Sequence, residues 1–322
     1  MKQNDLHNYF SYYAPYEAQN VLQRKLEKEY LARSASTHDA LQWSYRNTPA
    51  FHYEWLLGRT YWTEGAQSSL LTRPLLLFYG LTHLLKGILL TEDPHYPAAA
   101  DMLAHGVTTR KKKRKQFTFM EDEVKIQKQG FFPHFSSRMF HVKHSAGEKW
   151  KINHLFFKWD TMVHLYLDVY GEKALPRVQP ACANLTVEHV SPAKEQSISL
   201  IQKQLEQLGI EVEGIKKRTA DSVLFSIKRL PDNVHSQLVQ RGSNYYMPPS
   251  LLDTAKMAPL CVHYLLLYEL SMLCRYEGEW WGDLCTQRQG EDYAFIHFYL
   301  EWVLAEVPRQ FTGFFSSGES LQ

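Results

Sequence analysis

The segment from Leu75 to Leu90 is apolar on nearly all sides of a helix, which indicates a helix that is buried all round or spans a bilayer. His83 and Lys86 lie in its middle, and a lysine near the centre of a bilayer costs about 2.5–3.5 kcal/mol. The uninterrupted apolar run is also shorter than the ~20 residues that a span needs. The pattern therefore predicts the central helix of a bundle, in which Lys86 extends to a rim and His83 pairs with a buried polar group. A role for both in a functional site is the alternative.

Close packing against this helix is indicated by Gly80 and Gly87, which are seven residues apart and lie on roughly one face. Two further apolar helices are expected at residues 258–281 and 291–308, the second ending at Pro308. Their apolar faces require burial, so we expect all three helices to pack together.

Other parts of the chain have weaker patterns. Residues 1–65 predict helices with polar breaks. Residues 116–143 alternate apolar and polar positions around Gly130 and Pro133, which predicts a short hairpin or an excursion from the bundle. A helical period returns at residues 151–172 and is ended by Gly171.

Sequence patterns typical of β-strands are concentrated between residues 180 and 233. β-Branched residues in alternation predict strands at 183–191 and 221–231, with a further candidate strand at 210–218. An amphipathic helix is expected at 193–209, closed by Gly209. The predicted fold is therefore mainly α, a helical bundle with a small α+β insertion. The bundle would occupy 1–179, with a basic loop and the hairpin, and 234–322, and the insertion would occupy 180–233.

Composition narrows the function only slightly. The net charge of +2 is too small for a general polyanion binder, so attraction to phosphate requires local clustering. The four cysteines form no CxxC pair, which favours reduced thiols and a cytoplasmic location. No apolar segment follows a basic one at the start of the chain, so no signal peptide is predicted.

The densest charge cluster is the basic run "RKKKRK". Its members are Arg110, Lys111, Lys112, Lys113, Arg114 and Lys115. Such a run is able to bind a nucleic-acid backbone or a nucleotide phosphate, with strong salt dependence, or to contact an acidic protein surface. The alternative is a solvated loop. Aromatic residues follow the run and do not interleave with it, which argues against base reading.

A second candidate is "CRYEGEWW" at residues 274–281, where arginine, carboxylates and large rings meet at a helix end. The residues of interest are Arg275, Tyr276, Glu277, Trp280 and Trp281. This composition is typical of an interface hot spot. It also suits a structural lock, in which Arg275 pairs with a buried carboxylate and fixes the helix end.

Several stretches together resemble the YaaC-like family of bacterial proteins. They are "QNDLHNYFSYYAPYEAQNVL", "RPLLLFYGLTHLLKGILL", "HGV" and "LSMLCRYEGEWW", in this order. The resemblance spans most of the chain. Genes of this family are often found near the gene of IMP dehydrogenase, which suggests nucleotide metabolism as a context and IMP dehydrogenase as a candidate partner.

The apolar helix with "RP", "YG" and a lysine, followed by "HG", also resembles the wider HEPN group of helical bundles. Many members of that group cleave RNA with an Arg and a His four to six residues apart on one helix. Arg138 and His144 have this spacing. Arg46 and His52 have it too, but Pro49 between them argues against one continuous helix.

Signatures of common enzyme classes are not found. The chain has no nucleophile elbow, phosphate-binding glycine loop or dinucleotide fingerprint, so no cofactor is predicted. His141 and His144 have the spacing of two metal ligands but lack the carboxylate of an HExxH motif, so no metal is predicted either. The sequence favours a cytosolic, non-catalytic protein that binds and regulates another macromolecule. A metal-independent ribonuclease using Arg138 and His144 and a nucleic-acid or nucleotide binder using the basic run are the alternatives.

Overall fold

The structure, a computed structural model, describes residues 10–109, 117–181, 184–190, 195–249 and 251–315. The chain divides into two compact units, Met1–Lys151 with Ala258–Gln322 and Ile152–Met257. The first unit is mainly helical and the second contains most of the strands, which confirms the mainly α class of the whole chain.

Eight α-helices belong to the described part of the first unit. They are α2 (Gln19–Ala32), α3 (Thr37–Gln67), α4 (Arg73–Glu92), α5 (Phe131–Phe140), α10 (Pro259–Tyr276), α11 (Gly278–Gln287), α12 (Glu291–Gln310) and α13 (Thr312–Phe315). Short 3₁₀ helices occupy Ser11–Glu17, Ala100–Leu103 and Phe119–Glu121.

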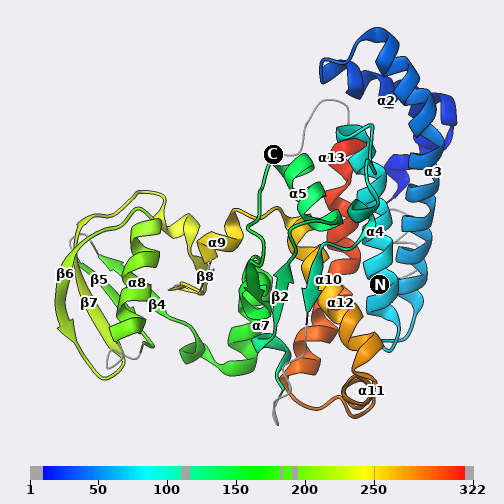
Figure 1. The fold of residues 1–322 in the computed structure, drawn as a ribbon. Helices are drawn as coiled ribbons and strands as arrows, with labels where there is room; N and C mark the ends of the chain where they lie inside the picture. The colour runs from blue at the N-terminus through cyan, green and yellow to red at the C-terminus, as the bar shows by residue number, and fades with distance from the viewer. Residues whose placement is uncertain (1–9, 110–116, 182–183, 191–194, 250, 316–322) are drawn as a thin grey trace. The chain divides into compact units, whose positions relative to one another are not determined.

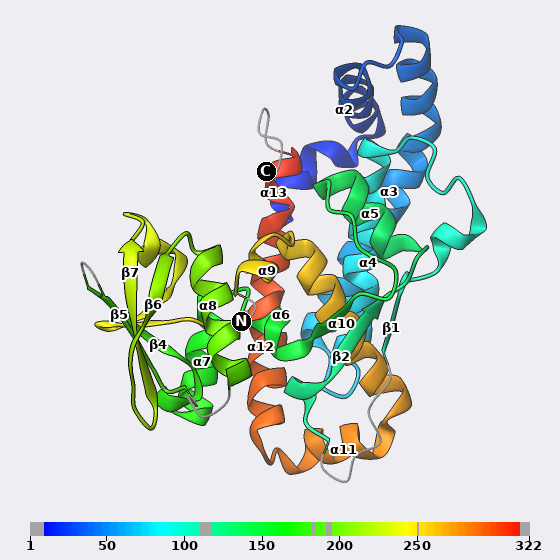
Figure 2. The ribbon, with the colours of Figure 1, turned by 60° about the vertical axis from the view of Figure 1, so that its left-hand side comes forward.

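Helix α4 is the predicted central helix, and Pro74 in its first turn suits a position that needs no N–H donor. It runs beside α3 and α10 (Figure 1 and Figure 2). Phe78 of α4 packs edge-on against Tyr264 of α10, with the ring centroids 5.2 Å apart. Among the described helices, α4 alone is long and apolar enough to cross a membrane, but 72% of its apolar window is buried inside the protein. This burial agrees with a core helix.

The approach of α3 to α4 depends on glycine. A Cβ on Gly80 would lie 3.0 Å from the backbone nitrogen of Trp62, and one on Gly58 would lie 2.8 Å from the backbone nitrogen of Leu84. The distance at Gly58 is shorter than real Cβ contacts, and the distance at Gly80 is tighter than nine in ten of them, so both positions favour glycine, which has no side chain. Gly87 has its nearest neighbours at 3.7 Å, an ordinary contact, so only Gly80 of the predicted pair sets the spacing.

The hairpin predicted for 116–143 does not form, because this segment holds one strand and its two partner strands lie outside it. A small antiparallel sheet has the order β1-β2-β3, with β1 at Val107–Thr109, β2 at Glu123–Ile126 and β3 at Lys149–Lys151. The second half of the segment is α5, not a strand. Its buried residues Phe131, Phe132 and Phe135 follow a helical spacing, and Pro133 falls in the first turn, where it is tolerated.

The second unit is built on a six-stranded antiparallel sheet of order β6-β7-β5-β4-β9-β8. The strands are β4 (Arg177–Ala181), β5 (Asn184–Glu188), β6 (Glu211–Arg218), β7 (Ser222–Arg229), β8 (Val239–Arg241) and β9 (Asn244–Tyr246). Four short or medium helices accompany them: α6 (Ile152–Phe156), α7 (Asp160–Tyr170), α8 (Glu195–Gln207) and α9 (Leu251–Ala255). Two 3₁₀ turns occupy Glu172–Ala174 and Val234–Gln237.

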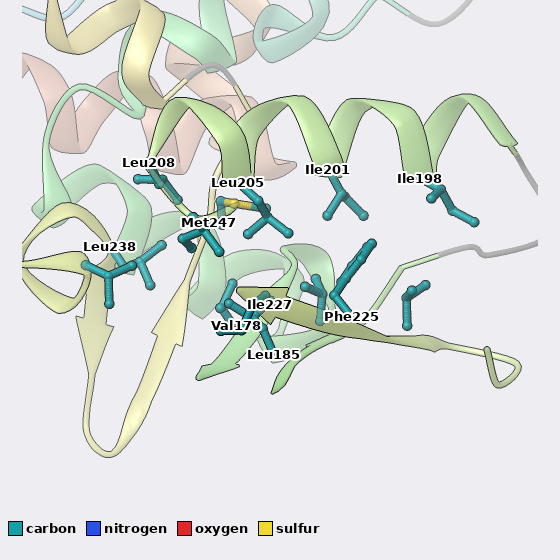
Figure 3. Packing of buried hydrophobic residues seen from close by; sticks show 14 residues of the cluster. Val178, Leu185, Ile198, Ile201, Leu205, Leu208, Phe225, Ile227, Leu238 and Met247 are labelled. Carbon is teal, nitrogen blue, oxygen red and sulfur yellow. The ribbon is translucent and has the colours of Figure 1, made fainter. Parts of the chain in front are cut away.

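Helix α8 covers one face of this sheet (Figure 3). Its apolar stripe, including Ile201 and Leu205, points at Phe225 and Ile227 of β7, and all are buried. The three strands and the helix that the sequence predicted form, and Leu185 of β5 stands opposite Phe225 in the ladder. Residues of β7 alternate between buried and partly buried positions, which is why the alternation in its sequence predicted a strand.

This unit extends beyond the expected range of 180–233. The added residues include α7, β8 and β9, which surround a second small core containing Val163, Leu167 and Tyr246. Strand β9 pairs with β4 through Arg177 and Tyr246. Three-residue strands carry too little alternation to be read from the sequence alone.

Candidate functional site

The "CRYEGEWW" segment spans a helix–helix junction. Helix α10 ends at Tyr276 and α11 begins at Gly278, with Glu277 between them at φ −117° and ψ 49°. Trp281 is buried, and its indole Nε1–H donates to the carbonyl oxygen of Leu71 at 3.1 Å. Trp281 therefore fixes the junction to the chain before α4.

Unlike the buried Trp281, Tyr276 is exposed at this junction, and Arg275 stacks on its ring. The Arg275 Nε–H donates to the carbonyl oxygen of Ser271 at 3.2 Å, and its guanidinium lies 5.1 Å from the centre of the Tyr276 ring. Within the described residues, Arg275 forms no ion pair with a carboxylate. Tyr276 is 67% exposed, which is high for a large ring. The pair presents an arginine stacked on an exposed tyrosine.

Trp280 connects the junction to Phe117, a residue of the segment that follows the basic run. Its ring packs edge-on against Phe117 at 4.9 Å, and Phe117 begins the described chain after the run. The backbone N–H of Phe119 donates to both carboxylate oxygens of Asp292, at 3.0 Å, where α12 begins. The basic run Arg110–Lys115 itself lies outside the described residues.

Arg138 and His144 are separated by the end of α5. The helix ends at Phe140, and His141 takes a left-handed conformation at φ 56°. The side chain of His144 is only 3% exposed, with Nε2 2.9 Å from the Ser136 hydroxyl. Arg138 is exposed, so the two residues do not share a helix or a solvent-facing surface.

A different histidine accompanies Arg138. His134 lies one turn earlier on α5, and its Nε2 is 2.9 Å from Oδ2 of the nearly buried Asp93. Arg138 Nε is 3.7 Å from the same oxygen. The hydrogen bond from His134 is the main reason that the pKa of Asp93 lies below its ordinary value. Asp93 thus orients the ring of His134 beside a cation, an arrangement that can handle a proton next to a phosphate.

Sequence reasoning missed His134 and Asp93 because they are 41 positions apart. The only local signal was the spacing of His134 and Arg138, which places both on one helical face.

His83 has the polar partner that was predicted for it. Its Nδ1 is 2.6 Å from Oε2 of Glu54 on α3, and its ring stacks on Tyr61 at 5.6 Å. Both members of the pair are partly buried. The pair fastens α4 to α3 in addition to the glycine contacts.

The reason given against the Arg46–His52 pair was wrong. Pro49 lies inside α3, which is one continuous helix from Thr37 to Gln67. Pro49 is exposed, so it lies on the solvent side of the helix. The guanidinium of Arg46 donates to the carbonyl oxygen of Pro94, and Nδ1 of His52 is buried without a hydrogen-bond partner among the described residues.

Helix α10 also carries a buried carboxyl group, that of Glu269. Glu269 is fully buried, and it lies beside Thr109 and the carboxyl of Asp122. Burial is the main reason that its pKa is raised well above the ordinary value, and the nearby carboxyl of Asp122 raises it further.

Across the described residues no cluster of three or more His, Cys, Asp and Glu side chains could hold a metal ion. Cys274 and Cys285 are not in disulfides.

Comparison with known proteins gives one result. A family model described as YaaC-like Protein matches residues 14–315, almost the whole chain. The chain belongs to the YaaC-like family. No curated protein and no solved structure matches it. The YaaC-like match covers both compact units, including the junction at α10 and α11 and the Asp93–His134 pair.

Proposed function

We propose that this YaaC-like protein is a cytosolic, non-catalytic binding protein that regulates another macromolecule. The observation that supports this best is the α10–α11 junction, where Arg275 lies over the exposed ring of Tyr276 and the buried Trp281 binds the carbonyl oxygen of Leu71. Arginine and tyrosine on a rigid support are the residues that contribute most energy at protein interfaces. The charge of the basic run Arg110–Lys115 would make an acidic partner surface complementary.

An enzyme of purine nucleotide metabolism is the partner to test first, and IMP dehydrogenase is the specific candidate, because of the gene context of the family. The experiment is a pull-down from native cytosol, with and without nuclease treatment, followed by mass spectrometry. We expect one stoichiometric protein that survives nuclease and is lost with Tyr276→Ala or Arg275→Ala. Glu279→Ala, at an exposed position of the same junction, is the matched control.

Recovery of RNA with the protein would reject this proposal, and so would the loss of all co-purifying proteins after nuclease treatment. It would favour nucleic-acid binding by Arg110–Lys115. In that case, neutralising these six residues should abolish binding, and the affinity of the unmodified protein should fall steeply between about 50 and 200 mM salt.

A ribonuclease of HEPN-like type is the second candidate function. It is favoured by the position of Arg138 beside a histidine that Asp93 orients. His134 fits the role of proton carrier better than His144, because His144 is buried. Cleavage of RNA without a metal, lost in Arg138→Ala and His134→Ala but retained in His144→Ala, would establish this activity. The Arg46→Ala and His52→Ala variants test the other pair in the same assay.

A further inference from the structure

Helix α4 is buried from Leu77 to Thr91 except at three positions, Tyr79, His83 and Lys86, which are partly exposed. These three residues are four and three positions apart, so they lie on one face of the helix. His83 is paired with Glu54, but Lys86 forms no hydrogen bond or ion pair with a described residue. A partly buried ammonium group without a counter-charge is costly, and a bound anion would remove that cost.

Helix α10, which runs beside α4, carries a second cation of this kind (Figure 1 and Figure 2). Arg275 is partly buried and forms no ion pair with a described carboxylate. Phe78 of α4 packs edge-on against Tyr268 of α10, with the ring centroids 5.5 Å apart. The chain before α4 meets the end of α10, where the thiol of Cys274 donates to the carbonyl oxygen of Leu71 at 2.9 Å. The two helices are therefore antiparallel.

The ring of His105 lies against both helices, 6.4 Å from the ring of Tyr79 and 5.6 Å from that of Tyr268. Lys86 and Arg275 each follow one of these tyrosines by seven residues, so each shares a helix face with it. Helical side chains lean toward the N-terminus of their helix, and the Arg275 Nε–H indeed donates to a carbonyl oxygen one turn earlier. Because the helices are antiparallel, Lys86 and Arg275 lean toward His105 from opposite sides.

The charges of both cations act on His105. Burial is the main reason that the pKa of His105 lies below its ordinary value, and Arg275 and Lys86 lower it further. Cations have this effect because they disfavour the protonated ring. The place that these three residues share is therefore electropositive, which favours an anion.

Tyrosine hydroxyls near His105 add neutral hydrogen-bond donors. The hydroxyl of Tyr264 donates to the carbonyl oxygen of His105 at 3.2 Å. Burial is the main reason that the pKa of Tyr264 is raised well above its ordinary value, and three nearby hydroxyls raise it further, those of Tyr268, Tyr96 and Tyr79. The hydroxyl of Tyr96 is buried without a hydrogen-bond partner among the described residues. An oxyanion accepts hydrogen bonds from hydroxyls and from cations alike.

We propose that Lys86, Arg275 and His105 form a binding site for the phosphate group of a small molecule, called here the α4–α10 anion site. A phosphate monoester carries a charge of about −1.5 to −2 at pH 7, which two cations balance. The α4–α10 anion site does not depend on the protein partner proposed for the α10–α11 junction. Arg275 belongs to both, but Lys86 is not part of that junction, so the pull-down with Lys86→Met should still recover the partner.

Isothermal titration calorimetry of the full chain with phenyl phosphate and with inorganic phosphate tests the α4–α10 anion site. We expect one ligand per chain, and binding about tenfold weaker in Lys86→Met and in Arg275→Met, the usual effect of losing a hydrogen bond to a charged group. Lys86→Arg keeps the charge and should keep most of the affinity. Lys28→Met, at an exposed position of α2, is the matched control and should bind like the unmodified protein.

Absence of binding, or equal affinity in Lys86→Met and the unmodified protein, would overturn the proposal. Binding that is lost only when Arg110–Lys115 is neutralised would also overturn it, because the phosphate would then belong to the basic run. Tighter binding of phenyl phosphate than of inorganic phosphate would support a ligand whose organic group contacts the neighbouring rings, and equal binding would support free phosphate.

NMR of the histidine rings locates the bound anion. Phosphate should shift the ring signals of His105, which are identified by their absence in His105→Gln, and the shift should be lost in Lys86→Met. Acetate, with a single negative charge, should shift these signals less at the same concentration. Equal shifts with acetate would reject the match to a phosphate group, and shifts confined to other histidines would place the anion elsewhere and overturn the proposal.

Discussion

At the scale of single residues, buried charge is the property with the clearest consequences. Glu269 is enclosed beside another carboxyl, that of Asp122, whereas Asp93 is bound by His95 and His134, so their pKa values are shifted in opposite directions. Burial penalises the charged form, whereas a donor or a nearby cation stabilises it. The two carboxyls therefore contribute to stability in different ranges of pH.

For Glu269 we predict that the Glu269→Gln variant gains stability relative to the unmodified protein as the pH rises. The raised pKa means that folding binds a proton, so the contribution of Glu269 is complete below the unfolded pKa and is lost as the pH rises through the folded pKa. An amide keeps the shape and stays neutral. Melting temperatures at pH 5, 7 and 8 measure this effect, with Glu279→Gln as the exposed control. Equal pH dependence in Glu269→Gln and the unmodified protein would contradict the prediction.

For Asp93 we predict that Asp93→Ala lowers the free energy of unfolding at pH 7 by about 1.5–3 kcal/mol, the range for hydrogen bonds to charged groups. The lowered pKa means that its contribution is present above the unfolded pKa and is lost as the pH falls through the folded value. The difference from the unmodified protein should thus shrink in acid. Urea titrations at pH 7 and at pH 3 check this, and the exposed Asp101→Ala should change little at either pH.

At the scale of elements, the packing of α3 on α4 illustrates what a glycine can determine. We predict that Gly58→Ala lowers the free energy of unfolding by about 1–3 kcal/mol, the usual cost of overpacking, because its Cβ meets the backbone of Leu84. Gly87→Ala is the matched control on the same helix pair. Its Cβ has ordinary contacts, and alanine is favoured over glycine in a helix by about 1 kcal/mol, so it should be neutral or stabilising. Similar losses in both variants, measured by urea unfolding, would show that close approach is not the cause.

At the scale of the whole molecule, the second unit is one uninterrupted segment with its own cores. We predict that residues 152–257 expressed alone fold and unfold in a single cooperative transition, because α8 and the six-stranded sheet bury their apolar faces against each other. Circular dichroism at increasing temperature measures this. A broad, non-cooperative loss of signal would mean that the unit needs the rest of the chain.

The sequence by itself determined the elements whose periodicity is long and regular. The apolar segment at 75–90, the helix at 193–209 and the strand at 221–231 all formed, because hydrophobic spacing is a local property. Pro49 was misjudged by a local rule: a helix packed along its length tolerates one proline on its exposed side.

Only the tertiary structure decided which distant residues meet. Glu54 pairs with His83, Asp93 pairs with His134, and β9 completes the sheet beside β4. Spacing along the chain shows which face of an element is apolar, but not which element covers that face or which polar groups are enclosed with it. That choice depends on the packing of whole elements, and it leaves the exposed ring of Tyr276, with Arg275 stacked on it, at the surface.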